Sequence, residues 1–235
     1  SNSSKQKDRR LSNHPDPSLD ILYLDNHLIA VRKPAGVLTQ PDDSGTVSLM
    51  DQVKDWIKTE YKKPGKVFLG LVHRLDRPVS GIVVFARTSK GASRLSEQFR
   101  EKTTKKIYRA LVEGTPQPQQ ASLTHYLRKE KSLKATVFPR ATPNAKEAVL
   151  DYEVIETLES TSLLDIHLHT GRFHQIRAQL AFIGHPIVGD KKYGAHSTLP
   201  EGQIALCAHR LIFKHPTSKE EISIESSPPS CWPTP

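Results

Sequence analysis

The chain reads His73-Arg74-Leu75-Asp76-Arg77-Pro78-Val79-Ser80-Gly81 and then continues into an apolar segment at residues 82–86. A polar loop with a proline, followed by a short run of β-branched and aromatic residues, is typical of a turn that delivers a buried strand. Asp76 lies between two arginines, whose positive charge favours the ionised carboxylate and makes it a candidate nucleophile or base. In an isolated loop, an Asp that caps a turn or forms a local ion pair is the more common alternative.

Periodic patterns on both sides of this loop indicate the rest of the fold. Alternating or continuous apolar runs predict strands at residues 21–23, 28–31, 82–86, 106–113, 148–157 and 164–168. Helical spacing behind a capping residue or a glycine predicts helices that begin after Ser48, after Thr88 or Ser89, and near Gly171. Strands at hairpin distance with occasional helices favour an α+β domain with a mixed, mostly antiparallel central sheet and flanking helices. They do not favour alternating βαβ units.

Length and composition fit one domain that needs no disulfide or metal to fold. The chain has 235 residues, and residues 17–225 are expected to form this domain. Residues 1–16 are polar and are expected to be a flexible lead-in, while residues 226–235 are expected to be a Pro-rich tail. Cys207 and Cys231 lack metal-ligand spacing, so a reducing compartment, the cytoplasm, is expected. No apolar run is long enough to cross a bilayer.

The charge balance indicates a polyanionic partner. The formal net charge is +9 and the isoelectric point is about 9.5. Positive residues gather between residues 125 and 146, at Arg128, Lys129, Lys131, Lys134 and Arg140. The alternative is an ordinary solvated basic surface, which net charge alone does not distinguish from a nucleic-acid contact.

A second polar cluster reads His167-Leu168-His169-Thr170-Gly171-Arg172-Phe173-His174-Gln175-Ile176-Arg177. Three histidines suggest a metal site, but no carboxylate or thiolate completes a ligand set, so metal binding is the weaker hypothesis. If a helix starts near Gly171, Arg172 lies at its positive end, where a cation requires an anion. That anion is either a phosphate or a protein carboxylate. No dinucleotide or P-loop motif occurs.

Four ordered stretches resemble the RluA-type pseudouridine synthases, which convert uridine to pseudouridine in RNA. The family's first loop resembles Val31-Arg32-Lys33-Pro34-Ala35-Gly36-Val37, and its aspartate loop resembles His73-Arg74-Leu75-Asp76 with Ser80-Gly81. Its tyrosine-bearing strand resembles Lys106-Ile107-Tyr108-Arg109-Ala110-Leu111-Val112. Its last motif region resembles Thr170-Gly171-Arg172 with His174-Gln175-Ile176-Arg177, then Gly184-His185-Pro186-Ile187, Gly189-Asp190 and Tyr193-Gly194. The resemblance spans about residues 20–215. Position 79 departs from it, with Val where relatives often have Thr.

The resemblance implies a role for each matching residue. Asp76 is implied as the nucleophile that assists cleavage of the bond between uracil and ribose, and Arg177 as its salt-bridge partner. Tyr108 is implied to stack on the target base, with Ile176 in the same pocket; an ordinary strand aromatic is the alternative for Tyr108. Arg74 is implied to fill the gap that a flipped uridine leaves in the RNA stack.

The expected function is therefore an RNA pseudouridine synthase, an isomerase acting on tRNA or rRNA without a cofactor or a metal. Besides the catalytic Asp76, Tyr108 and Arg177, we expect substrate-binding roles for His73, Arg74, Ile176, Arg172, Arg128 and Lys129. Residues 125–146 are expected to be an RNA-facing loop. The short N-terminal lead-in favours compact substrates, and the protein is expected to be a monomer with no membrane partner. A noncatalytic RNA-binding protein with the same fold and a metal-dependent hydrolase are the alternatives.

Overall fold

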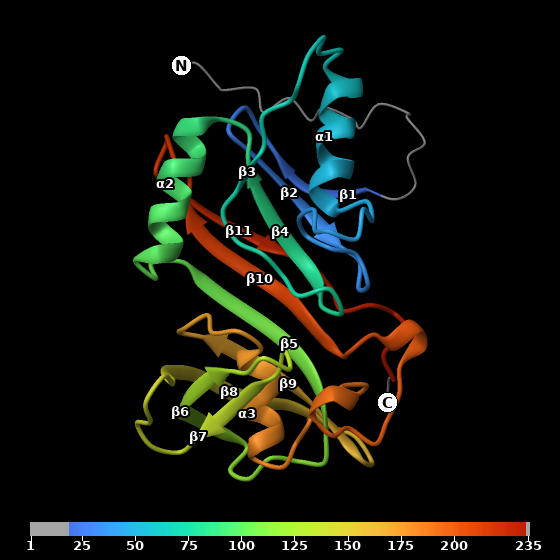
Figure 1. Cartoon of the computed structure of the whole chain (residues 1–235), viewed down its shortest axis with the longest axis vertical. Coiled ribbons are helices and arrows are strands. Elements are labelled where there is room, and N and C mark those ends of the chain that lie inside the picture. Colours follow the sequence, from blue (N-terminus) through green and yellow to red (C-terminus); the bar gives the residue numbers. More distant parts are fainter. Residues whose placement is uncertain (1–18, 234–235) are drawn as a thin grey trace, which may run out of the picture.

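The computed structural model describes residues 19–233 (Figure 1). The lead-in expected at residues 1–16 lies outside the described residues, as do the last two positions of the expected tail. Within residues 19–233 the strands are β1 (Asp20–Leu24), β2 (Leu28–Lys33), β3 (Gly70–Leu71), β4 (Ser80–Ala86), β5 (Lys105–Glu113), β6 (Gln120–Lys129), β7 (Ala135–Phe138), β8 (Lys146–Thr157), β9 (Thr161–Leu168), β10 (Leu206–Lys214) and β11 (Glu221–Glu225). The helices are α1 (Leu49–Glu60), α2 (Ser89–Arg100) and α3 (Gln175–Phe182), with short 3-10 helices at Lys191–Tyr193 and Pro200–Gly202.

All of the described strands join one sheet in the order β1-β2-β4-β10-β5-β9-β8-β6-β7, with β3 paired to β4 and β11 paired to β10. The pairs are antiparallel apart from β4 with β10, which run parallel. Figure 1 shows β10 and β5 crossing the middle of the molecule, with α1 and α2 towards one end and α3 towards the other. The α+β prediction with a mostly antiparallel sheet is confirmed.

The first two helices begin where their capping residues predict. Ser48 Oγ accepts a hydrogen bond from the Asp51 backbone N–H, and the Asp51 carboxylate accepts one from the Ser48 backbone N–H, which is the expected capping box of α1. Thr88 caps α2 by accepting from the Gly91 backbone. The third helix begins at Gln175, four residues later than Gly171, because His174 before it has a left-handed backbone with φ +54°.

Two apolar layers form because successive residues of a strand face opposite sides of the sheet. On one side Ile29 and Val31 pack with Val83, Phe85 and residues of α1 in the main core. On the other side Leu28 and Ala30 pack with Ile82, Val84 and Leu95 of α2. The loop at residues 73–79 thus enters a strand that is buried on both faces.

Two segments differ in form from their sequence-based description. Residues 125–146, expected as a loop, contain the paired strands β6 and β7, so their basic side chains alternate between two faces. In the segment expected to be a tail, Trp232 is 6% exposed and belongs to the main core. No helix in the described part of the chain is long and apolar enough to span a membrane.

Candidate active site

A pocket of about 560 Å³ opens beside the Asp76 loop. Its walls come from the loop before β4, the end of α2, strand β5, and the segment that leads into α3. It brings together nearly all of the residues predicted from the sequence: Asp76, Tyr108, Arg177, His73, Arg74, Ile176, Arg172 and Lys129. Arg128 is the exception.

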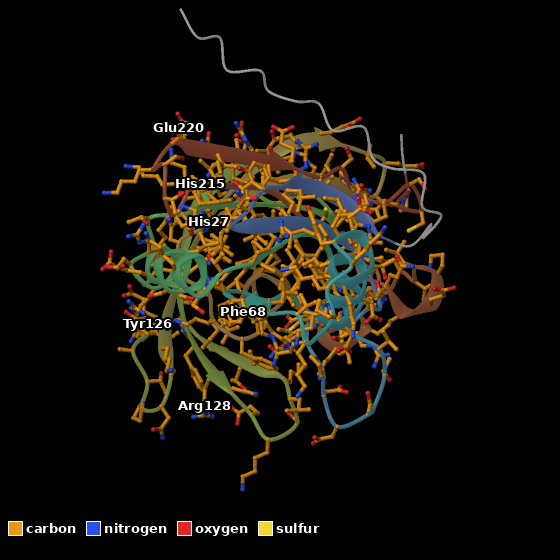
Figure 2. All side chains as sticks on the ribbon, turned by 90° about the horizontal axis from the view of Figure 1, so that it is seen from above. His27, Phe68, Tyr126, Arg128, His215 and Glu220 are labelled. Carbon is orange, nitrogen blue, oxygen red and sulfur yellow. The ribbon has the colours of Figure 1, made fainter. Side chains whose placement is uncertain are left out.

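Arg128 faces away from the pocket because it neighbours Lys129 on β6, where side chains alternate. Its Nε donates to Glu130 Oε1 at 2.7 Å and its guanidinium lies over the Phe138 ring. Figure 2 places Arg128 near the outer edge of the molecule. Lys129 instead lies with Nζ 4.4 Å from the centre of the Phe173 ring, at the pocket wall.

The Asp76 loop is fixed by the loop that follows β2. The Gly36 backbone N–H donates to Arg77 O at 2.7 Å, and Arg77 Nε donates back to Gly36 O at 2.9 Å. Thr39 Oγ1 donates to Leu75 O at 2.9 Å. These contacts on both sides of Asp76 explain why two motifs about forty residues apart in sequence serve one site.

Lys33 is the centre of this support. Its side chain is fully buried, and Nζ donates to the backbone oxygens of Pro34, Val37 and Arg77 at 3.0, 2.7 and 3.0 Å. Burial lowers the pKa of Lys33 to about 7, while the nearby Asp76 carboxylate acts in the opposite direction. An ammonium with three carbonyl partners is a rigid support for the loop that carries Asp76.

Gly81 allows the strand after the loop to approach β10. Its φ is +121°, and an added Cβ would lie less than 3 Å from three backbone atoms of Ala208. Only glycine accepts both this backbone conformation and this contact. The Ser80-Gly81 motif therefore has a packing reason: it brings β4 against β10, the strand that pairs with β5 and its Tyr108.

The Asp76 side chain is about one-third exposed, and the ionisable side chain that faces its carboxylate is His174. His174 Nε2 lies 3.8 Å from Asp76 Oδ2, which is too long for a hydrogen bond. The salt bridge expected between Asp76 and Arg177 is not among the ion pairs of the described residues. Arg177 instead donates from Nε and Nη2 to the two carboxylate oxygens of Asp190 at 2.8 and 2.9 Å.

The Arg177–Asp190 pair is almost entirely buried, with side-chain exposures of 7% and 1%. Burial alone would lower the pKa of Arg177, but the hydrogen bonds and charge of Asp190, together with the Asp76 charge, raise it. The guanidinium is thus held by one carboxylate while it remains within electrostatic range of the other.

His174 lies between this arginine and Asp76. Arg177 Nη1 is 3.2 Å from His174 Nε2, and since an arginine only donates, Nε2 is the acceptor. The ring proton is then on Nδ1, 2.7 Å from the Tyr193 hydroxyl, which also accepts from the Ala135 backbone N–H. Burial, reinforced by the Arg177 charge, lowers the pKa of His174 to about 3 and keeps the ring neutral.

Tyr108 and Ile176 belong to the apolar part of the pocket lining. Tyr108 is half-buried on β5, and burial followed by the Asp76 charge raises the pKa of its phenol far above the usual value. The phenol therefore stays protonated near the carboxylate. An aromatic ring beside an apolar side chain is a surface on which a planar base can stack.

The remaining predicted residues have separate roles. His73 accepts at Nε2 from the Val84 backbone N–H at 2.9 Å and stacks on Phe99, so it supports the pocket wall. Arg74 is exposed at the pocket. Arg172 lies before α3, and its Nε donates to the Glu147 backbone oxygen at 2.8 Å.

The histidines on β9 and just after it do not converge on a metal site. His167 and His169 are exposed, and His169 Nε2 lies 2.7 Å from Asp151 Oδ2. Among the described residues no group of three His, Cys, Asp or Glu side chains is arranged to hold a metal ion.

Three residues to which the sequence assigned no individual role complete the site: Lys33, Asp190 and Tyr193. Each stood in a motif whose resemblance was noted, but spacing alone could not show which side chains meet. Full burial of a lysine requires partners, but the burial of Lys33 at the end of β2 is visible only in the structure.

Comparisons with known proteins agree with this site. A family described as RNA pseudouridylate synthase matches residues 27–182. The tRNA pseudouridine synthase C of Haemophilus influenzae is 33% identical over 91% of this chain and 95% of that protein. The ribosomal large subunit pseudouridine synthase D of Zymomonas mobilis is 32% identical over 94% of this chain and 73% of that protein. The solved structure of human RNA pseudouridylate synthase domain containing 4 has a TM-score of 0.75 at 25% identity, covering 90% of this chain and 89% of that chain.

Proposed function

The chain belongs to the RNA pseudouridylate synthase family, and we propose that it isomerises uridine in a tRNA or an rRNA through Asp76. The observation that carries the assignment of the site is the convergence of Asp76, Tyr108 and Arg177 in one pocket. They come from a loop, a strand and a helix that lie far apart in the sequence. A protein that only bound RNA would not need a carboxylate among these cations.

The reaction is an isomerisation in which atoms balance without a cofactor. The bond between uracil N1 and ribose C1′ breaks, the base turns, and a bond forms between uracil C5 and C1′. The proton of C5 is lost and N1 gains one. In this scheme Asp76 assists cleavage at the ribose, while Tyr108 and Ile176 hold the base plane as it turns.

The substrate uridine has to leave the RNA stack to reach Asp76. Arg74 is exposed two residues before Asp76, where its planar guanidinium can occupy the vacated position in the stack. Relatives named for tRNA and for the large ribosomal subunit support these two RNA classes as substrates.

Release of tritium from RNA labelled at uracil C5 tests the proposal. Wild-type protein is expected to release label from unmodified tRNA or rRNA transcripts, and Asp76→Asn is expected to release none above background. Asp55→Asn, an exposed carboxylate on α1, is the matched control and should retain wild-type release. Label release that Asp76→Asn retains would refute the catalytic role, and loss of wild-type release in a chelator would favour a metal-dependent reaction.

A further inference from the structure

The amino group of Lys106 lies in the pocket without a partner. Lys106 lines the pocket on β5, and a Cβ added to Gly171 on the facing segment would lie 3.4 Å from its Nζ. Within residues 19–233 this ammonium forms neither a hydrogen bond nor an ion pair. Its side chain is nevertheless half-buried.

A half-buried charge without a partner is unfavourable unless a ligand compensates it. Burial, followed by the charge of Lys102, lowers the pKa of Lys106, so both of the causes oppose the cation. A bound anion would reverse this balance by pairing with Nζ. The site is thus suited to a negatively charged group that arrives with the substrate.

The neighbouring side chains exclude an internal partner. The pocket is lined by the cations Arg74, Lys102, Lys106, Lys129, Arg172 and Arg177, and Asp76 is the one carboxylate among the lining residues. Asp76 faces His174 Nε2 at 3.8 Å and lies near Lys33, and it forms no ion pair with Lys106 in the described part of the chain. The neighbouring His73 cannot accept from Lys106 at Nε2, because that nitrogen already accepts from the Val84 N–H.

We propose that Lys106 binds a phosphodiester of the RNA strand beside the uridine that enters the pocket. The proposal rests on the function proposed above and adds a phosphate subsite to it. Lys106 and Tyr108 are two positions apart on one strand, and both line the pocket. Their attachment points are therefore about 6.5 Å apart. A base stacked on Tyr108 brings its own backbone within reach of the long lysine side chain.

Lys106→Met tests this role, because Met keeps an apolar stem and loses the charge. Lys105→Met is the matched control: Lys105 is the preceding residue, exposed and outside the pocket lining. Binding of an in vitro transcribed, unmodified tRNA pool is measured across salt concentrations. We expect the slope of log K against log salt to fall by about 0.7 to 0.9 for Lys106→Met, with weaker binding at every salt concentration.

Turnover separates this subsite from the chemistry. A phosphate contact exists equally in ground and transition states, so KM should rise about tenfold while kcat changes less than about twofold. Lys106→Arg keeps the charge and should restore most of the salt dependence. Thermal unfolding of each variant identifies loss of fold. If Lys106→Met does not fold, Lys106→Gln replaces it, and a wild-type slope for Lys106→Gln overturns the phosphate role.

Several outcomes would overturn the phosphate role. These are a wild-type slope for Lys106→Met, an equal fall for Lys105→Met, or weaker binding with an unchanged slope, which would indicate a contact to a base. If the wild type binds with the Lys106-dependent slope but releases no tritium, the phosphate subsite stands and the proposed isomerase function fails.

Discussion

Arg177 donates two hydrogen bonds to Asp190 and is held by this buried carboxylate, not by Asp76. The third nitrogen of the guanidinium faces His174, whose ring stands between Arg177 and Asp76. Arg177 therefore has two separable functions: its charge satisfies Asp190 in the core, and the same charge acts on the Asp76 carboxylate. Each function can be removed without the other.

Single removal of Arg177 or Asp190 is expected to destabilise the fold strongly. Arg177→Leu leaves Asp190 buried and unpaired, and we expect a loss of about 3 to 5 kcal/mol in the free energy of unfolding, measured in urea. The double variant Arg177→Leu with Asp190→Leu removes both charges and should recover most of that loss. It should still lack tritium release, because the Arg177 charge no longer acts on Asp76.

The exposed pair of Arg210 and Glu225 is the control for this experiment, since its partners are 42% and 64% exposed. Arg210→Leu should change the free energy of unfolding by less than about 1 kcal/mol. Wild-type turnover in the double variant would show that Asp76 does not need Arg177.

Tyr193→Phe is expected to loosen His174. The hydroxyl accepts from the Ala135 N–H and binds His174 Nδ1, so its loss leaves two donors without their acceptor. We expect about 1 to 3 kcal/mol less stability. Turnover should fall roughly tenfold to a hundredfold, because the ring that contacts Arg177 is no longer fixed.

Tyr126→Phe is the matched control on β6, since Tyr126 forms no hydrogen bond with the described residues through its hydroxyl. Its unfolding free energy should stay within about 0.5 kcal/mol of wild type. Equal effects of the two substitutions on turnover would contradict a positioning role for Tyr193.

His73 is expected to make the protein acid-sensitive. Burial lowers the pKa of His73 to about 3, below the unfolded value of about 6.5, so the unfolded chain takes up the proton first. Stability is therefore lost as the pH falls from about 6.5 towards 3, by about 2 kcal/mol between pH 6.5 and 5. His73→Gln cannot titrate and should show a smaller loss over the same interval, measured by urea unfolding at each pH.

The exposed His167 provides the comparison. His167→Gln should leave the wild-type dependence of stability on pH unchanged. If the two variants lose stability equally as the pH falls, the His73 ring is not the source of the sensitivity.

Lys33→Met is expected to affect both fold and turnover. Three backbone oxygens lose their donor, which should cost at least about 3 kcal/mol of stability. Because Arg77 O is one of them, the loop of Asp76 should move and turnover should fall even where the protein remains folded. Lys58→Met, an exposed lysine in the last turn of α1, should leave both quantities near wild type. Full turnover in folded Lys33→Met would contradict the role of Lys33 as a support.

The sequence by itself determined many of the elements and singled out Asp76 as the candidate nucleophile. Hydrophobic periodicity and the capping residues Ser48 and Thr88 are local signals, because they depend on contacts within a few residues along the chain. They predicted β1, β2, β4, β5, β8, β9 and the starts of two helices, but not β3, β6, β7, β10 or β11. The family resemblance then selected Asp76 over an ordinary turn aspartate.

Only the tertiary structure decided which charges pair. The sequence is compatible with an ion pair of Arg177 with Asp76 or with Asp190. The pair forms with Asp190 because residues 184–190 pack beside α3. The left-handed His174 shifted the start of that helix, which helix periodicity could not show. Because neighbouring residues of β6 face opposite sides of the sheet, Lys129 lines the pocket and Arg128 does not. These outcomes depend on contacts between segments that are distant in the sequence. Burial strengthens such polar contacts because the effective dielectric constant inside the protein is low, and sequence spacing does not reveal which groups are buried together.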